Sequence, residues 1–247
     1  MKLKGKAKKH YYNMLSIIFA TLALSLSLLN NFVGIPTGFG MVVDLSAVPI
    51  FLSLFLISYK HAVKTLSLFT LALIFLSPSG FIGAIMKFTA TIPLIFIPYI
   101  FSYRTKNAVF LMVILLLMLI ISFGIFSHVY IINELISSIF LFAFSSFLVI
   151  FIDKKKFLHS NYSYFSFFIA VVVRGIIMVV TNIYFAGPLF FKLSPNEIIS
   201  FVESIGIPFI GKTSIFYVIF FWNAVQSIIE VFVAYVVATS KVIKKHL

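Results

Sequence analysis

The sequence contains no cysteine, which excludes disulfide bonds, thiolate metal sites and thiol nucleophiles. Charge is also scarce: only 10% of the 247 residues are charged, and only six residues are acidic. A soluble domain carries about 25% charged residues because its surface faces water. Most of the surface of this protein must therefore face a different solvent.

The sequence also lacks the motifs of common enzymes. There is no H-E-x-x-H, no G-x-S-x-G and no Walker phosphate loop. The five histidines share no spacing, so no metal site is expected. A membrane enzyme would need clustered acids or histidines at the membrane edge, where the chain offers only Asp44, Asp153 and isolated histidines. We expect a protein that is not an enzyme, has no cofactor and cannot hydrolyse ATP itself.

Long apolar runs dominate what is present, since 62% of the residues are hydrophobic and the mean hydropathy is +1.17. Runs near 20 residues fit membrane-crossing helices, whereas the strands of a membrane barrel are about 10 residues long. The sequence predicts an all-α, polytopic membrane helical bundle of about eight transmembrane helices, forming a single membrane domain over 1–247. The eight apolar segments are 14–33, 42–58, 61–77, 80–102, 107–126, 129–152, 163–187 and 213–240.

The net charge of +13 is concentrated between and beyond these runs, where five short clusters hold fourteen of the nineteen lysines and arginines. With a cytoplasmic N-terminus, all five clusters fall on the cytoplasmic side, as the positive-inside rule expects. This threading predicts a multi-pass protein of a cell membrane with both termini in the cytoplasm. The placement fits lipid head groups better than nucleic acid, which we do not expect as a partner. Residues 1–29 are expected to be an uncleaved first helix, because no A-x-A cleavage site follows them.

Two external connections stand out. Residues 34–40 are rich in glycine and carry Phe39 at the tip, so they form either a flexible turn or a lid over a site. Residues 188–212 are long for a connection between packed helices. In this second connection, Ser194, Pro195 and Glu197 predict the capped start of a short amphipathic helix.

Four ionisable residues lie well inside the apolar segments, away from their ends: Lys87, Glu134, Arg174 and Glu230. Such groups are costly in lipid and by default face the bundle interior. Arg174 and Glu230 lie at nearly equal distances from the inner ends of consecutive helices, so we predict that they form an ion pair. The pair has two possible roles, a strut that fixes helix register or a direct contact with a ligand.

Further polar and aromatic residues are expected close to the depth of Lys87, in the outer half of the membrane. On the last helix, Asn223, Gln226 and Glu230 share one face by their spacing. Each residue also has a structural explanation, such as snorkelling of a lysine or membership of an aromatic belt. Together they predict one ligand pocket, formed by Phe39, Asp44, Lys87, Asn182, Tyr184, Trp222, Asn223 and Gln226.

Small residues repeat at four-residue spacing in the first helix, where Ser16 precedes Ala20 and Ala23 precedes Ser27. This spacing lets helices approach closely, although it is common by chance. We interpret these four residues as a surface for docking a partner.

Four stretches resemble the substrate-binding S components of energy-coupling factor (ECF) transporters, especially the riboflavin type. Residues 43–49 are similar to the family's Asp–Leu/Phe–Ser–x–Ile/Val–Pro segment at the start of helix two. Residues 80–83 resemble its glycine-rich start of helix four, 184–193 the segment after helix five, and 223–226 its closing helix. The matches extend over about 150 residues.

The chain departs from this family in two ways. The family has six helices, so 107–152 would be an inserted helical hairpin. The family often has Asn where Lys87 stands and Lys where Gln226 stands, and these departures leave the ligand open between riboflavin and a molecule of different chemistry.

The resemblance implies a membrane-embedded binding subunit of a prokaryotic importer for a vitamin or related micronutrient. Residues 34–40 would be its lid, and the first helix would belong to the docking face. The implied partners are a transmembrane coupling protein and two cytoplasmic ATPase subunits. The alternative is a non-transport scaffold of similar fold, like the cell-shape protein MreD. A self-sufficient secondary transporter is also considered, but no internal repeat supports it.

Overall fold

The computed structural model of the chain describes residues 6–103 and 164–240. The predicted hairpin 107–152, including Glu134, lies outside these residues. The fold is mostly helical, as the apolar segments predict. The helices are α1 (Lys6–Leu28), α2 (Asn30–Val33), α3 (Val48–Leu56), α4 (Tyr59–Leu76), α5 (Gly80–Tyr103), α8 (Tyr164–Thr181), α9 (Gly187–Phe191), α10 (Pro195–Ile205) and α11 (Ile215–Thr239), with strands β1 (Ile35–Pro36) and β2 (Val42–Val43) and a π-helical turn η2 (Asn182–Ala186).

Five stretches of the described chain are long and apolar enough to cross a membrane: Ala7–Leu28, Tyr59–Leu76, Gly80–Ile100, Ser166–Phe191 and Ile215–Thr239. Large apolar side chains remain exposed on their outer faces, including Met14, Ile17 and Ile18 of α1. In a bilayer these side chains face lipid and need no protein cover. The coarse prediction of an all-α, multi-pass membrane bundle is therefore supported.

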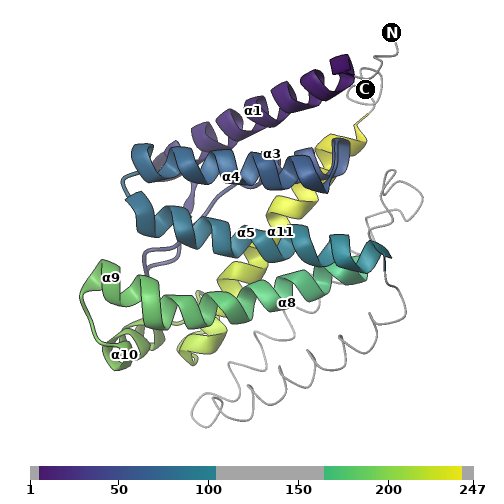
Figure 1. The fold of residues 1–247 in the computed structure, drawn as a ribbon. Helices are drawn as coiled ribbons and strands as arrows, with labels where there is room; N and C mark the ends of the chain where they lie inside the picture. The colour runs from purple at the N-terminus through teal and green to yellow at the C-terminus, as the bar shows by residue number, and fades with distance from the viewer. Residues whose placement is uncertain (1–5, 104–163, 241–247) are drawn as a thin grey trace.

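The long helices form two layers (Figure 1). Helices α1, α4, α5 and α8 lie side by side in that order, each packed on the next. Helix α11 crosses this row diagonally and packs on α8 and α3, while α3 packs on α1 and α4. Apolar surface gains little from helix contact when the alternative is lipid, so close packing and polar contacts stabilise such a bundle. Gly175 of α8 illustrates this, because a Cβ there would collide with the ring of Phe220 on α11.

Helix α3 is shorter than expected. The sequence predicts one helix over 42–58, but α3 has nine residues, which extend only about 13.5 Å. That length is less than half of a hydrocarbon core of about 30 Å. Pro49 lies in the first turn of α3, and the residues before the helix form strand β2 and then a turn. The rest of the predicted segment, residues 42–47, is therefore not helical.

A small hairpin precedes α3. Strands β1 and β2 pair antiparallel, with Ile35 opposite Val43 and Pro36 opposite Val42. The turn between them contains Gly38 and Gly40, both at positive φ, a conformation that glycine adopts without strain. The Phe39 side chain between these glycines is buried in an apolar cluster that includes residues of α8, α10 and α11. We call residues 34–47 the hairpin segment. Its tip is packed into the bundle.

The end of α8 also differs from the prediction. The apolar segment expected to end near 187 continues through η2 and α9 to Phe191, where Lys192 adopts a left-handed conformation that ends the helix. Helix α10 then begins as its sequence predicts, with Ser194 and Glu197 forming a capping box. The N–H and hydroxyl of Ser194 donate to the Glu197 carboxylate, which lowers the pKa of Glu197.

Candidate functional site

Asp44 is the centre of a compact polar cluster at the C-terminal end of the hairpin segment. One carboxylate oxygen accepts hydrogen bonds from the Ser46 backbone N–H at 2.8 Å and the Ser46 hydroxyl at 2.6 Å. The other oxygen accepts from the Asn30 amide and pairs with the Lys87 ammonium. Lys87 also donates to the Ser46 hydroxyl oxygen at 2.7 Å. Residues from α2, the hairpin segment and α5 thus share one carboxylate.

The surroundings keep Asp44 ionised although its side chain is only 2% exposed. Burial raises the pKa of Asp44, but the charge of Lys87 and hydrogen bonds from Lys87 and Ser46 outweigh this effect. The pKa therefore lies below its ordinary value of 3.8. The Lys87 side chain is 27% exposed, so the cluster is accessible from the Lys87 side.

A second ion pair lies deeper in the bundle. Arg174 Nη1 of α8 lies 3.1 Å from Glu230 Oε2 of α11, and both side chains are at most 3% exposed. Gln226 donates to the other Glu230 oxygen at 3.0 Å, and Arg174 Nε donates to Asn223 Oδ1 at 3.4 Å. The arginine and glutamate are therefore paired at equal depth, as their positions in consecutive apolar segments predict. The contacts join α8 to α11, which is consistent with a strut.

The hairpin segment also approaches the second ion pair, because Asn223, which accepts from Arg174, lies with its Nδ2 atom 3.7 Å from the sulfur of Met41 in this segment.

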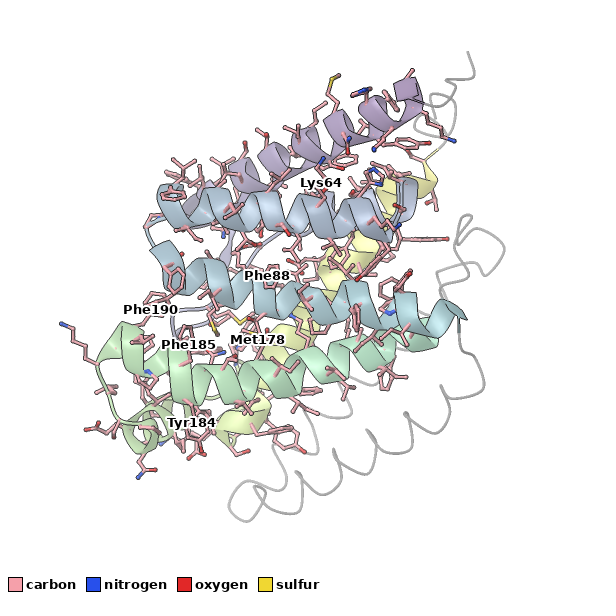
Figure 2. The ribbon with its side chains drawn as sticks, in the orientation of Figure 1. Lys64, Phe88, Met178, Tyr184, Phe185 and Phe190 are labelled. Carbon is pink, nitrogen blue, oxygen red and sulfur yellow. The ribbon has the colours of Figure 1, made fainter. Side chains whose placement is uncertain are left out.

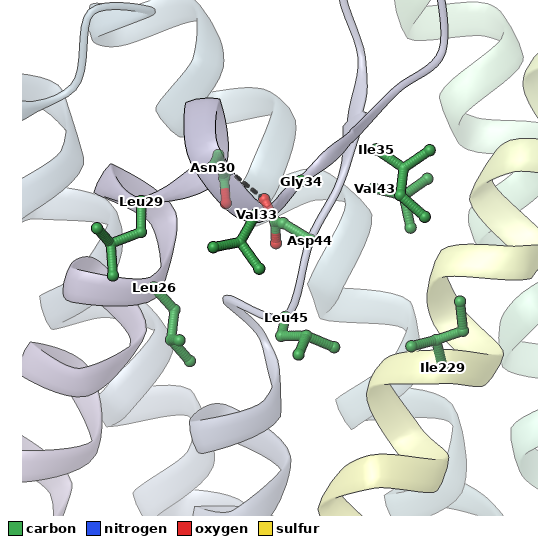
Figure 3. Close-up of a pocket in the computed structure, with 10 residues that line it drawn as sticks. All are labelled: Leu26, Leu29, Asn30, Val33, Gly34, Ile35, Val43, Asp44, Leu45 and Ile229. Carbon is green, nitrogen blue, oxygen red and sulfur yellow. Dashed lines mark hydrogen bonds between the residues drawn. The ribbon is translucent and has the colours of Figure 1, made fainter.

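A cavity of about 240 Å³ opens beside Asp44 (Figure 3). It lies between the end of α1, the hairpin segment and α11, and its walls are apolar except for Asn30 and Asp44. The remaining lining residues are Leu26, Leu29, Val33, Gly34, Ile35, Val43, Leu45 and Ile229. The shape and lining suit a small, mainly apolar molecule with a polar group at one end.

The predicted pocket residues divide into three sets. Asp44 lines the cavity and Lys87 touches Asp44, so these two lie together as expected. Asn223 and Gln226 instead serve the Arg174–Glu230 pair. Phe39 and Trp222 pack in or against the apolar cluster around the start of α11.

Two residues do not join the predicted pocket. Tyr184 of η2 is 69% exposed and lies on the outside of the bundle (Figure 2). Asn182 donates to the carbonyl of Met178 in its own helix at 2.7 Å. Their outward or local orientation follows from the π-helical turn, which changes the helical register at this point. We therefore remove Asn182 and Tyr184 from the candidate site.

The predicted docking surface on α1 also needs correction. Ser16, Ala20 and Ala23 are buried inside the bundle, where Thr65 of α4 donates to the Ser16 carbonyl. Ser27 is only half-buried. The small residues therefore allow close packing within the chain and are not accessible to a partner.

Sequence analysis missed two important members of the site. Asn30 holds Asp44 from α2, and Ile229 forms the α11 wall of the cavity. The only sequence signal was the polar pair Asn30–Asn31 at the end of an apolar run. Within residues 6–103 and 164–240, no group of three potential metal ligands occurs.

Comparisons with protein-family models, with curated proteins and with solved structures give no match to this chain. The functional interpretation therefore depends on the site itself.

Proposed function

We propose that the protein is the membrane-embedded substrate-binding subunit of an importer, of the type of the ECF S components. The observation that carries this proposal is the cavity beside Asp44, with Asn30 and the Asp44–Lys87 pair at its polar end. Ionisable groups at such positions are costly in a membrane protein and commonly mark a ligand pathway. A cavity next to them gives a ligand access to the charges.

The lining defines the class of ligand. Apolar walls favour a flat or aliphatic body, and Asn30 and Asp44 offer a donor and acceptors to one polar edge, with Lys87 behind Asp44 as its ionic partner. A vitamin or related micronutrient, with a riboflavin-like molecule as the first candidate, has this division into apolar body and polar edge.

The hairpin segment has to move for such a ligand to enter. The cavity of about 240 Å³ is slightly smaller than typical ligand pockets of roughly 300–1,000 Å³. Residues 34, 35 and 43–45 of the segment form one wall, and Phe39 is packed into the bundle. A lid of this kind would open the site and then exclude water after binding.

The proposed subunit needs partners. In this proposal a transmembrane coupling protein and two cytoplasmic ATPase subunits supply the energy of transport. The proposed location is the plasma membrane of a prokaryotic cell, with both termini in the cytoplasm. The basic N-terminal ends of α1 and α4 support this orientation.

A scaffold function, like that of MreD, is the second candidate. One observation favours it: Asp44 and Glu230 already have cationic partners within the chain. A protein built only for assembly would keep these pairs closed and bind no small molecule.

Ligand identification distinguishes the two candidates. The full-length protein, purified in mild detergent, would be examined by absorbance and mass spectrometry for a co-purifying molecule and then titrated with flavins and other vitamins. A transport subunit binds one ligand per chain, and Lys87→Met weakens that binding by about tenfold or more because Asp44, which lines the cavity, loses the cation that holds it in place. Lys192→Met, at an exposed position distant from the cavity, is the matched control. Absence of binding across the panel would contradict the proposal and favour the scaffold.

A further inference from the structure

A group of lysines lies where the N-terminal ends of α1 and α4 meet, and we call this region the basic end. Helices α1 and α4 pack against each other, and Asn13 and Ser16 of α1 contact Lys64 and Thr65 of α4. The two helices therefore run parallel, with both N-termini at the same end (Figure 1). The basic end carries Lys8, Lys9, Lys60 and Lys64.

Lys64 lies between the two helices and is half-buried (Figure 2). Its ammonium donates to the side-chain oxygen of Asn13 at 2.9 Å, which is a neutral partner. Lys9 precedes Asn13 by four residues and Lys60 precedes Lys64 by four, so both lie one turn closer to the helix ends on matching faces. The helical spacing thus places three lysines along the α1–α4 contact.

A second side of the same contact is also cationic and aromatic. The Lys8 ammonium lies 5.6 Å from the centre of the Tyr12 ring. The ring of Tyr12 in turn meets the edge of His61 at 5.7 Å. The Nδ1 atom of His61 is within 2.9 Å of the Ser58 hydroxyl. These contacts hold Lys8 against α4.

No carboxylate of the described chain balances this charge. Residues 6–103 and 164–240 contain four carboxylates, and each has its partner elsewhere. Asp44 pairs with Lys87, and Glu230 pairs with Arg174. Glu197 caps α10, and Glu203 accepts from the backbone of Ile215. Among the described residues the basic end therefore has no acidic partner, which leaves its positive charge available to an external anion.

The position of Lys64 identifies the kind of anion. Lys64 is five residues into α4, about 7.5 Å along the helix axis. A lysine at this depth extends its ammonium towards the phosphate level of the bilayer. Exposed apolar residues of α1, including Met14 and Ile18, continue from this level into the membrane. A molecule with a phosphate head and acyl chains matches both parts of the surface.

We propose that the basic end binds the phosphate of an anionic phospholipid, held by Lys9, Lys60 and Lys64 beside Asn13. Zwitterionic lipids bind less well, because their head groups carry a compensating cation. The site is independent of the proposed transport function, since it lies at the N-terminal ends of α1 and α4 and shares no residue with the cavity beside Asp44.

The test is a titration of the full-length protein in detergent with phosphatidylglycerol or phosphatidylcholine, followed by native mass spectrometry. The expected result is one preferred phosphatidylglycerol site. Each of Lys9→Gln, Lys60→Gln and Lys64→Gln should weaken it about fivefold. Gln at position 64 can still donate to Asn13, and unfolding temperatures without lipid would confirm that the variants fold. Lys192→Gln, outside the basic end, is the matched control and should leave binding unchanged.

Three results would overturn the proposal. Equal binding of the two lipids would mean that charge is not recognised. Unchanged phosphatidylglycerol binding in the triple variant Lys9→Gln/Lys60→Gln/Lys64→Gln would show that the lipid binds elsewhere. An acidic protein surface would then be the partner to test for the basic end. Displacement of phosphatidylglycerol by an equal concentration of inorganic phosphate would show that the site takes a soluble anion.

Discussion

At the scale of single residues, two buried carboxylates are balanced in different ways. Glu230 is enclosed with Arg174 between two long helices, whereas Asp44 is held by an irregular segment next to a cavity. A buried charge is tolerated only when it is paired and hydrogen-bonded. Both pairs meet this condition, but of the two carboxylates only Asp44 lines the cavity.

The first prediction concerns the Arg174–Glu230 pair. Glu230→Gln leaves an uncompensated arginine in the bundle and should lower the free energy of unfolding by about 3–5 kcal/mol. The double variant Arg174→Gln/Glu230→Gln removes both charges, so its loss should be smaller than the sum of the two single losses. Thermal unfolding in detergent measures all three variants. Strictly additive losses would mean that the pair contributes no coupling.

The second prediction concerns pH and Asp44. Its pKa is lower in the folded protein than in the unfolded chain, because Lys87 and Ser46 favour the carboxylate. The stabilisation is therefore complete above the ordinary pKa of 3.8 and is lost as the pH falls through the lower, folded value. Wild-type protein should lose stability from about pH 5 downwards, and Asp44→Asn should be less stable at neutral pH with a flatter acid profile.

Subtracting the stability profile of Asp44→Asn from that of the wild type isolates the contribution of Asp44 from those of the other carboxylates. Unfolding temperatures between about pH 3 and about pH 7 provide the data. Identical acid profiles for wild-type and Asp44→Asn protein would contradict this assignment.

Sequence reasoning found the residue types of both pairs but not all of their partners. Arg174 and Glu230 were predictable because depth along two regular helices can be counted residue by residue. Asn30 was not, because its position depends on how the chain turns after α1. Tyr184 was misplaced because it lies within a π-helical turn, whose altered helical register hydropathy does not reveal.

At the scale of elements, close approach of α8 to α11 depends on Gly175. Gly175→Ala would place a methyl group against the Phe220 ring and should destabilise the protein by about 1–3 kcal/mol through overpacking. Adding Phe220→Leu should recover part of this loss by removing the ring. Unfolding temperatures of the single and double variants test the prediction. No recovery in the double variant would show that the ring is not the obstacle.

The long helices were easier to predict than α3. Helices α4, α5 and α11 coincide with long apolar segments, and their ends fall within a few residues of the predicted ones. The run over 42–58 is equally apolar, yet its first residues form β2 and the loop that carries Asp44. An apolar segment can be buried as a helix or as an irregular loop, so hydropathy does not separate the two conformations. In the folded protein, the contacts of Asp44 with Asn30 and Lys87 hold the irregular one.

At the scale of the whole molecule, the account requires the basic end to face the cytoplasm and α10 to face outside. The cysteine-free chain allows a direct test with single cysteines. Ser200→Cys, at an exposed position of α10, should react in intact cells with a membrane-impermeant maleimide. Ala7→Cys, exposed on α1, should react only after permeabilisation. Labelling of both from the same side would contradict the proposed orientation.

The central claim is that a small molecule binds in the cavity between α1, the hairpin segment and α11. The most direct test compares two bulky substitutions on α11, measured by the affinity for the ligand that the titration identifies. Ile229→Trp fills the cavity, whereas Val236→Trp lies two turns further along and is exposed on the outer surface. Ile229→Trp should abolish binding without lowering the unfolding temperature, and Val236→Trp should bind like wild type. Equal affinity of the two variants would show that the ligand binds elsewhere.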